Sequence, residues 1–246
     1  MAEGASPLEQ FAIHRVVNIH IGGIDASLTN SGVAMITATV LVTLFLTLGM
    51  RRRALVPGRW QSMAEMSYEF VANMVRENAG SAGMRYFPFI FTLFMFILFC
   101  NLLGLIPYNF TPTSHIAVTF VMAMVVFLGV TVIGFVRNGA GFLRLFVPAG
   151  VPIFLLPLIV IIEVISYLTR PISLAIRLFA NMMAGHTMLK VFATFVVSLG
   201  LLAGWAPLAF IVALTGLELL IAFLQAYVFA ILSCIYLNDA LNLQHH

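Results

Sequence analysis

Five polar side chains stand within long apolar stretches of the second half of this sequence: Glu163, Arg177, Asn181, His186 and Glu218. A guanidinium keeps its positive charge at any physiological pH, and placing it at bilayer depth costs roughly 2.5–3.5 kcal/mol or more. Such an arginine usually lines an ion path or pairs with a partner. Histidine and glutamate can exchange protons, whereas a permanent cation repels an excess proton. Together these residue types predict two partial proton routes, separated by a fixed positive charge that prevents a leak.

Helix geometry groups the first four of these residues by face. Arg177 and Asn181 are four residues apart and share a face. Glu163 lies fourteen residues before Arg177, nearly on that face and about 21 Å away along the axis. His186 lies nine residues beyond Arg177, about 13 Å along and on the opposite side. Titratable groups are therefore expected near both ends of the helix, with the arginine between them.

A second polar stripe follows in the last apolar run. Glu218 and Gln225 are seven residues apart and share a helical face, and Tyr236 lies on the same stripe near the other end. Gln225 thus stands towards the middle of its helix, as Arg177 does in the preceding one.

Each of these residues also has a purely structural interpretation. Arg177 could pair with a glutamate to hold helices together, and His186 could donate to a backbone carbonyl. Glu163 could pair with Arg170, seven residues away on the same face and about 10 Å along. Two amides could form simple interhelical hydrogen bonds: Asn181 and Gln225. His115 lies in a turn between apolar runs, where we expect it to be solvated.

Composition places the chain in a membrane. Of its 246 residues, 62% are hydrophobic and only 9% are charged, which excludes a soluble domain. The net charge of +3 is better explained by membrane topology than by nucleic-acid binding. Both cysteines, Cys100 and Cys234, lie in apolar runs and are expected to be small hydrophobic side chains rather than metal ligands. The sequence contains no G-x-x-x-x-G-K-[ST] loop, so we expect no nucleotide site. We also expect no cofactor and no metal site.

A spanning helix needs about 20 mostly apolar residues, and runs of that length divide the chain. After an N-terminal segment, 1–29, the first span is expected at 30–50. The region 86–136 is apolar and broken by the turn-rich string 107–115, which predicts a membrane hairpin. Between them, the basic segment 51–85 carries Trp60, Met63, Phe70, Val71 and Met74 on one helical face, typical of an amphipathic helix in the membrane interface.

Arginine placement predicts the orientation. The segment 51–85 holds six arginines, the N-terminal segment holds only Arg15, and the 107–115 turn holds none. Excess arginine marks the cytoplasmic side. We therefore expect the N-terminus and the 107–115 turn outside the cell, with three segments on the cytoplasmic side: 51–85, 137–150 and the tail 241–246.

The region 151–240 is harder to interpret. Its first 50 residues would form a helix of about 75 Å, too long for one upright span. Either the chain forms a hairpin near Arg170 and Arg177, or it forms one long, tilted or bent helix, and Pro171 allows a bend in both cases. Residues 200–207 look like a turn, and 207–237 another long helix. Hydropathy alone leaves both arrangements open.

Three motifs resemble the subunit a family of F-type ATP synthases. Residues 177–186, RLFANMMAGH, resemble that family's signature R-L-x-x-N-x-x-x-G. Residues 224–229, LQAYVF, resemble its L-Q-A-[FY]-[IV]-F stretch, and residues 101–107, NLLGLIP, resemble its N-L-x-G-L-[IL]-P stretch. The three matches lie in order and cover roughly residues 30–242.

The resemblance implies a role for each matching position. Arg177 takes the place of the essential stator arginine, and Gln225 and Asn181 take the places of polar residues that support it. Three positions match the outer half-channel: Asn101, His186 and Glu218. The cytoplasmic half-channel has two matching positions: Glu163, and Tyr236 near its mouth.

One departure from the enterobacterial pattern is informative. That pattern has glutamate after the A-G of the signature and histidine seven residues before the glutamine. Here the types are exchanged, as His186 and Glu218, in an arrangement similar to mitochondrial and alphaproteobacterial members. An exchange across a pair predicts that the two side chains meet in space and titrate as one unit.

The resemblance also implies a fold and partners. We expect an all-α integral membrane protein with about five membrane helices plus an interfacial amphipathic helix, the last two helices long and strongly tilted against a c-ring. Its partners would be the carboxylate-bearing c subunits, the b/b′ peripheral stalk, the rest of the synthase and the bilayer, with no nucleic acid.

A bacterial plasma membrane is favoured over the mitochondrial inner membrane, and sodium stays open as the coupling ion. The alternative function is a self-contained proton-coupled secondary transporter, although 1–149 shows no counterpart of the polar half.

Overall fold

The computed structural model describes residues 15–17, 20–21, 24–25, 27–51, 58–106, 110–147 and 154–241. The N-terminal part contains two short antiparallel pairs that the sequence did not predict. Strand β1 (Arg15–Val17) pairs with β4 (Leu28–Thr29), and β2 (His20–Ile21) pairs with β3 (Ile24–Asp25). Apart from these pairs, the described elements are helical.

Five helical segments in the described residues are long and apolar enough to cross a membrane. They are α1 (Asn30–Gly49); α2 (Arg59–Gly83), which continues through η2 (Met84–Tyr86) into α3 (Phe87–Gly104); α4 (Ile116–Asn138); α5 (Leu156–Ala203); and α6 (Trp205–Leu241). Short helices η3 (Pro112–Ser114) and η4 (Gly139–Phe146) precede and follow α4. The predicted all-α fold with five membrane helices is confirmed.

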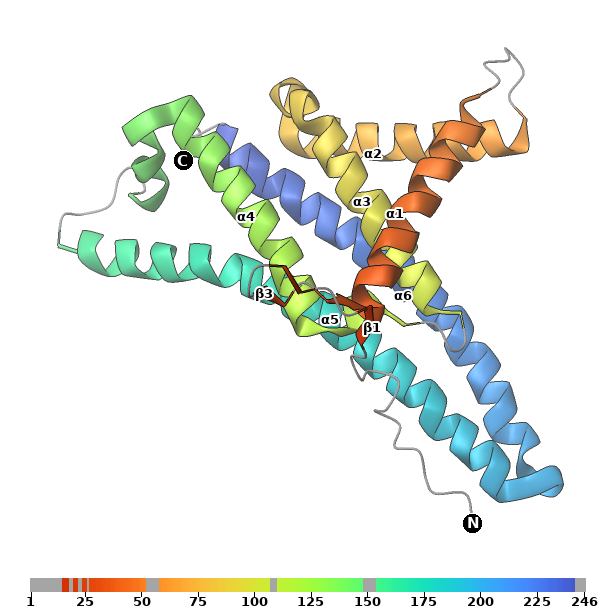
Figure 1. Cartoon of the computed structure of the whole chain (residues 1–246). Helices are drawn as coiled ribbons and strands as arrows, with labels where there is room; N and C mark the ends of the chain where they lie inside the picture. The colour runs from red at the N-terminus through yellow and green to blue at the C-terminus, as the bar shows by residue number, and fades with distance from the viewer. Residues whose placement is uncertain are drawn as a thin grey trace. The chain divides into compact units, whose positions relative to one another are not determined.

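Helices α5 and α6 are the longest elements, and each forms one continuous ribbon in Figure 1. Helix α5 has 48 residues and continues through Pro171, so the alternative of a hairpin near Arg170 and Arg177 is wrong. Helix α6 has 37 residues and is therefore about 55 Å long, well above the 30 Å thickness of the hydrocarbon core. This excess length is the physical reason for expecting tilt.

The junction between α5 and α6 is very short. Gly200 has φ 61°, a left-handed conformation that favours glycine, and it interrupts the last turn of α5. The Gly204 amide donates to the Gly200 carbonyl at 2.9 Å, and a Cβ on Gly204 would lie 2.6 Å from that oxygen. Gly204 is the only residue between the two helices, which confirms the predicted turn.

The chain forms two compact units, each built from several segments. The first comprises residues 1–48, 95–118 and 177–226, and the second comprises 49–94, 119–176 and 227–246. In the second unit, aromatic rings from α4, η4 and α5 pack around Phe142, which contacts Phe135, Phe146 and Tyr167. A Cβ on Gly134 would lie 2.4 Å from the Phe142 ring, so this packing needs a glycine there.

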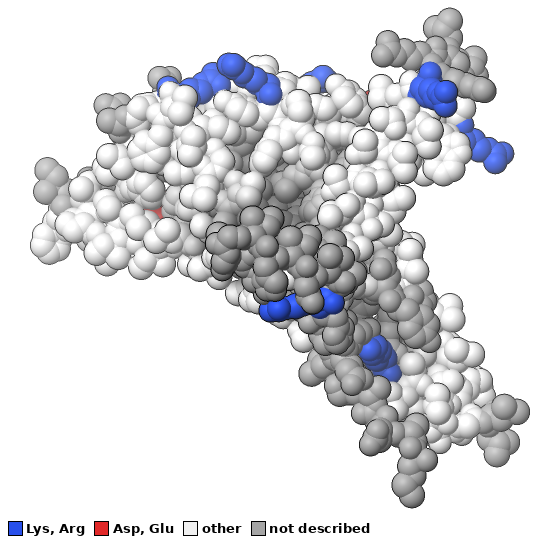
Figure 2. Space-filling view, viewed as in Figure 1, with Lys and Arg blue, Asp and Glu red and all other residues white. Residues whose placement is uncertain are grey.

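Helix α2 occupies the place of the predicted amphipathic helix, but its apolar side chains do not share one environment. Val71 and Met74 are buried, whereas Trp60 and Met63 are 69% and 55% exposed. The exposed apolar residues are typical of a surface that meets lipid rather than water. Figure 2 shows that most of the visible described surface carries neither acidic nor basic side chains, as expected for a membrane protein.

Candidate ion path

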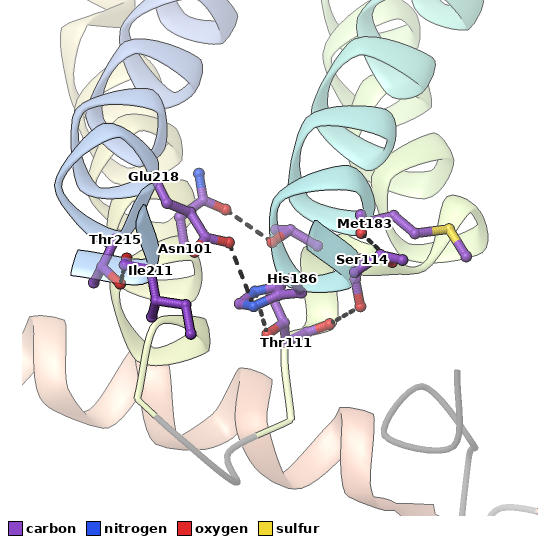
Figure 3. Close-up of polar contacts among 10 residues, drawn as sticks. Asn101, Thr111, Ser114, Met183, His186, Ile211, Thr215 and Glu218 are labelled. Carbon is purple, nitrogen blue, oxygen red and sulfur yellow. Dashed lines mark hydrogen bonds and ion pairs between the residues drawn. The ribbon is translucent and has the colours of Figure 1, made fainter. Parts of the chain in front are cut away.

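The exchanged pair meets within the first unit. His186 of α5 and Glu218 of α6 approach to 3.4 Å between Nδ1 and Oε1 (Figure 3). Glu218 is only 4% exposed, and its oxygens form no hydrogen bond with the described residues. Gly185 permits the approach, because a Cβ there would lie 2.6 Å from Glu218 Oε1. The predicted contact is therefore confirmed, and it pairs a buried carboxylate with an imidazole.

Asn101 of α3 lies in a buried polar cluster of the same unit. Its Nδ2 donates to the Ala222 carbonyl of α6 at 3.2 Å, and its Oδ1 accepts from the Thr113 hydroxyl at 2.8 Å. Asn101 and Thr113 are both fully buried. A buried amide with both ends bonded holds its neighbours in one arrangement. Asn101 thus joins α3, η3 and α6 beside the histidine–glutamate pair.

Sequence reasoning missed the hydroxyl residues that line this cluster. The Thr111 Oγ1 lies 3.1 Å from His186 Nε2, and the Ser114 hydroxyl donates to the Thr111 carbonyl at 2.6 Å (Figure 3). Thr111 lies against Gly104, where a Cβ would meet the threonine side chain at 2.5 Å. The only sequence signal was the clustering of hydroxyl residues in 111–114, which is also typical of an ordinary turn.

Three further predicted residues have no polar partner in the part of the chain that the structure describes. Arg177 is exposed on α5, Gln225 is buried on α6, and Asn181 is partly buried. Among the described residues, the structure shows no ion pair for Arg177 and no interhelical hydrogen bond for Asn181 or Gln225.

In the second unit, Arg170 binds an unpredicted carboxylate. Its Nη1 donates to Asp239 Oδ2 at 3.0 Å, and its guanidinium carbon lies 5.3 Å from the Tyr167 ring centroid and 4.9 Å from that of Tyr236. The pairing of Glu163 with Arg170 is therefore wrong. Glu163 is partly buried and has no polar partner among the described residues. The Tyr236 ring packs on the Arg170 guanidinium, so Tyr236 has a structural role in this cluster.

His115 differs from the solvated turn residue that the sequence predicted. Its ring stacks on Phe110 with centroids 4.9 Å apart and planes 15° apart, and its Nε2 is buried. Burial lowers the pKa of His115 below its ordinary value of 6.5. The neutral imidazole is therefore favoured at this position.

Comparison with known proteins agrees with these features. The family model described as ATP synthase A chain matches residues 32–238 of this sequence. The chain belongs to the ATP synthase subunit a family. It is similar to ATP synthase subunit a of Pelagibacter ubique (58% identical, covering 98% of this chain and 99% of the relative), of Parvibaculum lavamentivorans (59%, 97% and 94%) and of Chelativorans sp. (62%, 97% and 98%).

Membership of the subunit a family sets the function class. This subunit a is the proton-translocating stator subunit of an F-type ATP synthase and a multi-pass membrane protein, without a catalytic nucleotide site. The alternative of a self-contained secondary transporter is therefore wrong. Within the described residues, no three His, Cys, Asp or Glu side chains come together in a way that could hold a metal ion.

Proposed function

We propose that this subunit a provides two offset half-channels, with Arg177 between them. Protons enter from the outer side past Asn101, His186 and Glu218 and protonate a carboxylate of a c-ring subunit. They travel with the ring and leave on the cytoplasmic side near Glu163 and Tyr236. The drive for this flow is about 2.3 kcal/mol per charge per 100 mV of membrane potential.

The observation that supports the outer half-channel is the His186–Glu218 contact. A buried carboxylate with no hydrogen bond in the described chain is costly, and such groups inside membrane helices usually mark ion pathways. Here it faces an imidazole, the side chain whose ordinary pKa lies nearest to physiological pH. The pair therefore has the chemistry to take up and release protons.

The exposure of Arg177 supports its role as the stator charge. An exposed guanidinium with no partner in the described chain is available to a carboxylate of another subunit. As each c subunit passes, Arg177 favours the ionised carboxylate and blocks direct proton transfer between the half-channels. Asn181, one turn further along α5, and Gln225, on α6, provide polar surroundings for Arg177.

The proposed setting is a bacterial plasma membrane. The c-ring and the b/b′ peripheral stalk are the proposed partner subunits. The arginine distribution supports an outside N-terminus and a cytoplasmic C-terminus, with 51–85 and 137–150 inside and 86–136 as a hairpin that reaches the outer side. Part of this segmentation lies outside the described residues, namely 1–14, 18–19, 22–23, 26, 52–57, 107–109, 148–153 and 242–246.

The test is ATP-driven proton pumping in membrane vesicles that carry the complex with Arg177→Ala. We expect intact assembly and abolished pumping. The matched control is Arg76→Ala, which removes an exposed arginine of α2 without a polar partner in the described chain. Normal pumping by assembled Arg177→Ala would refute the stator role.

A further inference from the structure

The His186 ring has a different partner at each nitrogen. Nδ1 faces Glu218 Oε1 at 3.4 Å, and Nε2 faces the Thr111 hydroxyl at 3.1 Å. We propose that the Thr111 hydroxyl is the proton relay through which His186 gains and loses its proton at Nε2. This inference rests on the proposed outer half-channel and names the group that serves it.

The chemistry of the two partners differs. An ionised Glu218 has no hydrogen to donate, so its negative charge 3.4 Å from Nδ1 favours the imidazole tautomer with the hydrogen on Nδ1 and leaves the lone pair on Nε2. A hydroxyl can donate to that lone pair, and after rotation it can accept from the N–H of the charged ring. A threonine hydroxyl therefore suits both charge states of His186, which a carbonyl or an ammonium in the same place would not.

The proposed step moves one proton from the outer aqueous phase to His186. A hydrated proton from the outer aqueous phase gives its proton to the Thr111 oxygen, while the hydroxyl hydrogen moves to Nε2. Water, an intact hydroxyl and an imidazolium result, and the Nδ1 hydrogen stays turned towards Glu218. The imidazolium then gives its Nδ1 proton to ionised Glu218 across the 3.4 Å contact, and the neutral ring keeps the hydrogen on Nε2. Glu218 passes this proton to the c-ring carboxylate, and exchange with water of the half-channel returns the ring to the Nδ1–H tautomer. In pumping, the same transfers run in reverse.

The surroundings hold Thr111 in place for this role. The side chain is 5% exposed and lies against Gly104, where a Cβ would come within 2.5 Å of Oγ1 and of the methyl carbon. Its carbonyl accepts from the Ser114 hydroxyl, which fixes the turn that carries it. Two residues on, Thr113 is bonded to Asn101 of α3. The threonine thus has a defined position on a packed turn.

The experiment compares two replacements of Thr111 in the assembled complex in membrane vesicles. Thr111→Val keeps the shape and removes the hydroxyl, whereas Thr111→Ser keeps the hydroxyl and removes the methyl group. The control Thr187→Val removes a hydroxyl from the residue after His186, where the bond runs to the Met183 carbonyl of the same helix. Passive proton conduction and ATP-driven pumping are measured, with assembly checked by subunit content.

We expect Thr111→Val to conduct protons about tenfold more slowly, with Thr111→Ser and Thr187→Val within about twofold of the unaltered protein. If Thr111→Val does not assemble, Thr111→Ala removes the same hydroxyl without extra bulk and has the same expected result. Conduction at the unaltered rate without the hydroxyl would overturn the relay, as would a serine variant as slow as the valine variant.

A further variant separates this inference from the proposed half-channel. His186→Ala is measured in the same vesicles. Slow conduction in His186→Ala with normal conduction in Thr111→Val would overturn the relay and leave the half-channel standing. Normal conduction in His186→Ala would overturn both, because Thr111 acts only through that ring.

Discussion

Arg170 of α5 and Asp239 of α6 form an ion pair at 3.0 Å, and the guanidinium also lies on the rings of Tyr167 and Tyr236. The two charged side chains are 19% and 21% exposed, so the pair is only partly screened. Tyr167 extends the cluster to α4, because its hydroxyl lies 2.6 Å from that of Thr131. Three helices, α4, α5 and α6, are thus joined through one cluster around Arg170 and Tyr167.

Removing the carboxylate should therefore destabilise the second unit. Asp239→Asn leaves Arg170 without its charge partner, and we expect a lower thermal midpoint for the detergent-solubilised complex. A double-mutant cycle with Arg170→Gln should give a coupling of about 1–3 kcal/mol. Glu77→Gln, an exposed carboxylate of α2 without a polar partner in the described chain, is the control and should change little. A coupling near zero would contradict the role of the pair.

The space beside Gly185 should be essential for pumping. In Gly185→Ala the new methyl group would lie 2.6 Å from Glu218 Oε1 and displace the carboxylate from His186. We expect pumping to fall at least about tenfold in assembled complexes, as for loss of a proton-transfer group. Gly216→Ala is the matched control, since nothing lies within 4 Å of its added methyl group and alanine favours helix. Equal activity of the two variants would exclude the steric argument.

The two members of the titrating pair should be exchangeable. His186→Glu alone places two carboxylates together and Glu218→His alone places two imidazoles together, and each should abolish most pumping. The double variant restores one of each across the 3.4 Å contact. We expect it to recover a measurable part of the activity, because the pair acts as one unit. Initial pumping rates at matched subunit content test this, and a double variant as inactive as both single variants would count against coupling.

His115 should make stability depend on pH. Burial lowers its pKa, so the unfolded chain takes up a proton at higher pH than the folded chain does. Stability should therefore be unaffected by this group above about pH 6.5 and fall as the pH drops below that value. In His115→Phe the stack on Phe110 is kept and the titration is removed. Thermal midpoints between pH 7.5 and 5 should then fall less steeply than in the unaltered protein, and an unchanged slope would argue against His115.

Much of the helical fold is predictable because a membrane span needs a minimum apolar length. The short strands of 15–29 were not, since two or three residues are too few to show an alternating pattern. The continuity of α5 through Pro171 was also undecided, because a proline permits a bend without requiring one. The resemblance to a family, rather than hydropathy, favoured the long helix.

The site was predictable where a residue type was unusual for its surroundings. His186 and Glu218 were identified because ionisable groups are rare in apolar runs, and their exchange of types predicted the contact. Thr111 gave no such signal, since hydroxyl residues are common in turns. Asp239 was missed because an acidic residue at the end of an apolar run is usually solvated. Its pairing with Arg170 depends on which faces of α5 and α6 meet, and spacing within one helix does not contain that information.

The single-residue junction at Gly204 limits how the length of this chain can vary. His186 lies eighteen residues before Gly204 and Glu218 lies fourteen residues after it, with only the tight turn from Gly200 to Gly204 between the helices to absorb a change. One residue inserted into either helical stretch would rotate the part beyond it by about 100° and advance it by about 1.5 Å. The Glu218 carboxylate would then no longer contact the His186 imidazole. Insertions and deletions that evolution tolerates should therefore fall outside residues 186–218. The contact between His186 and Glu218 thus fixes the number of residues in this part of the chain.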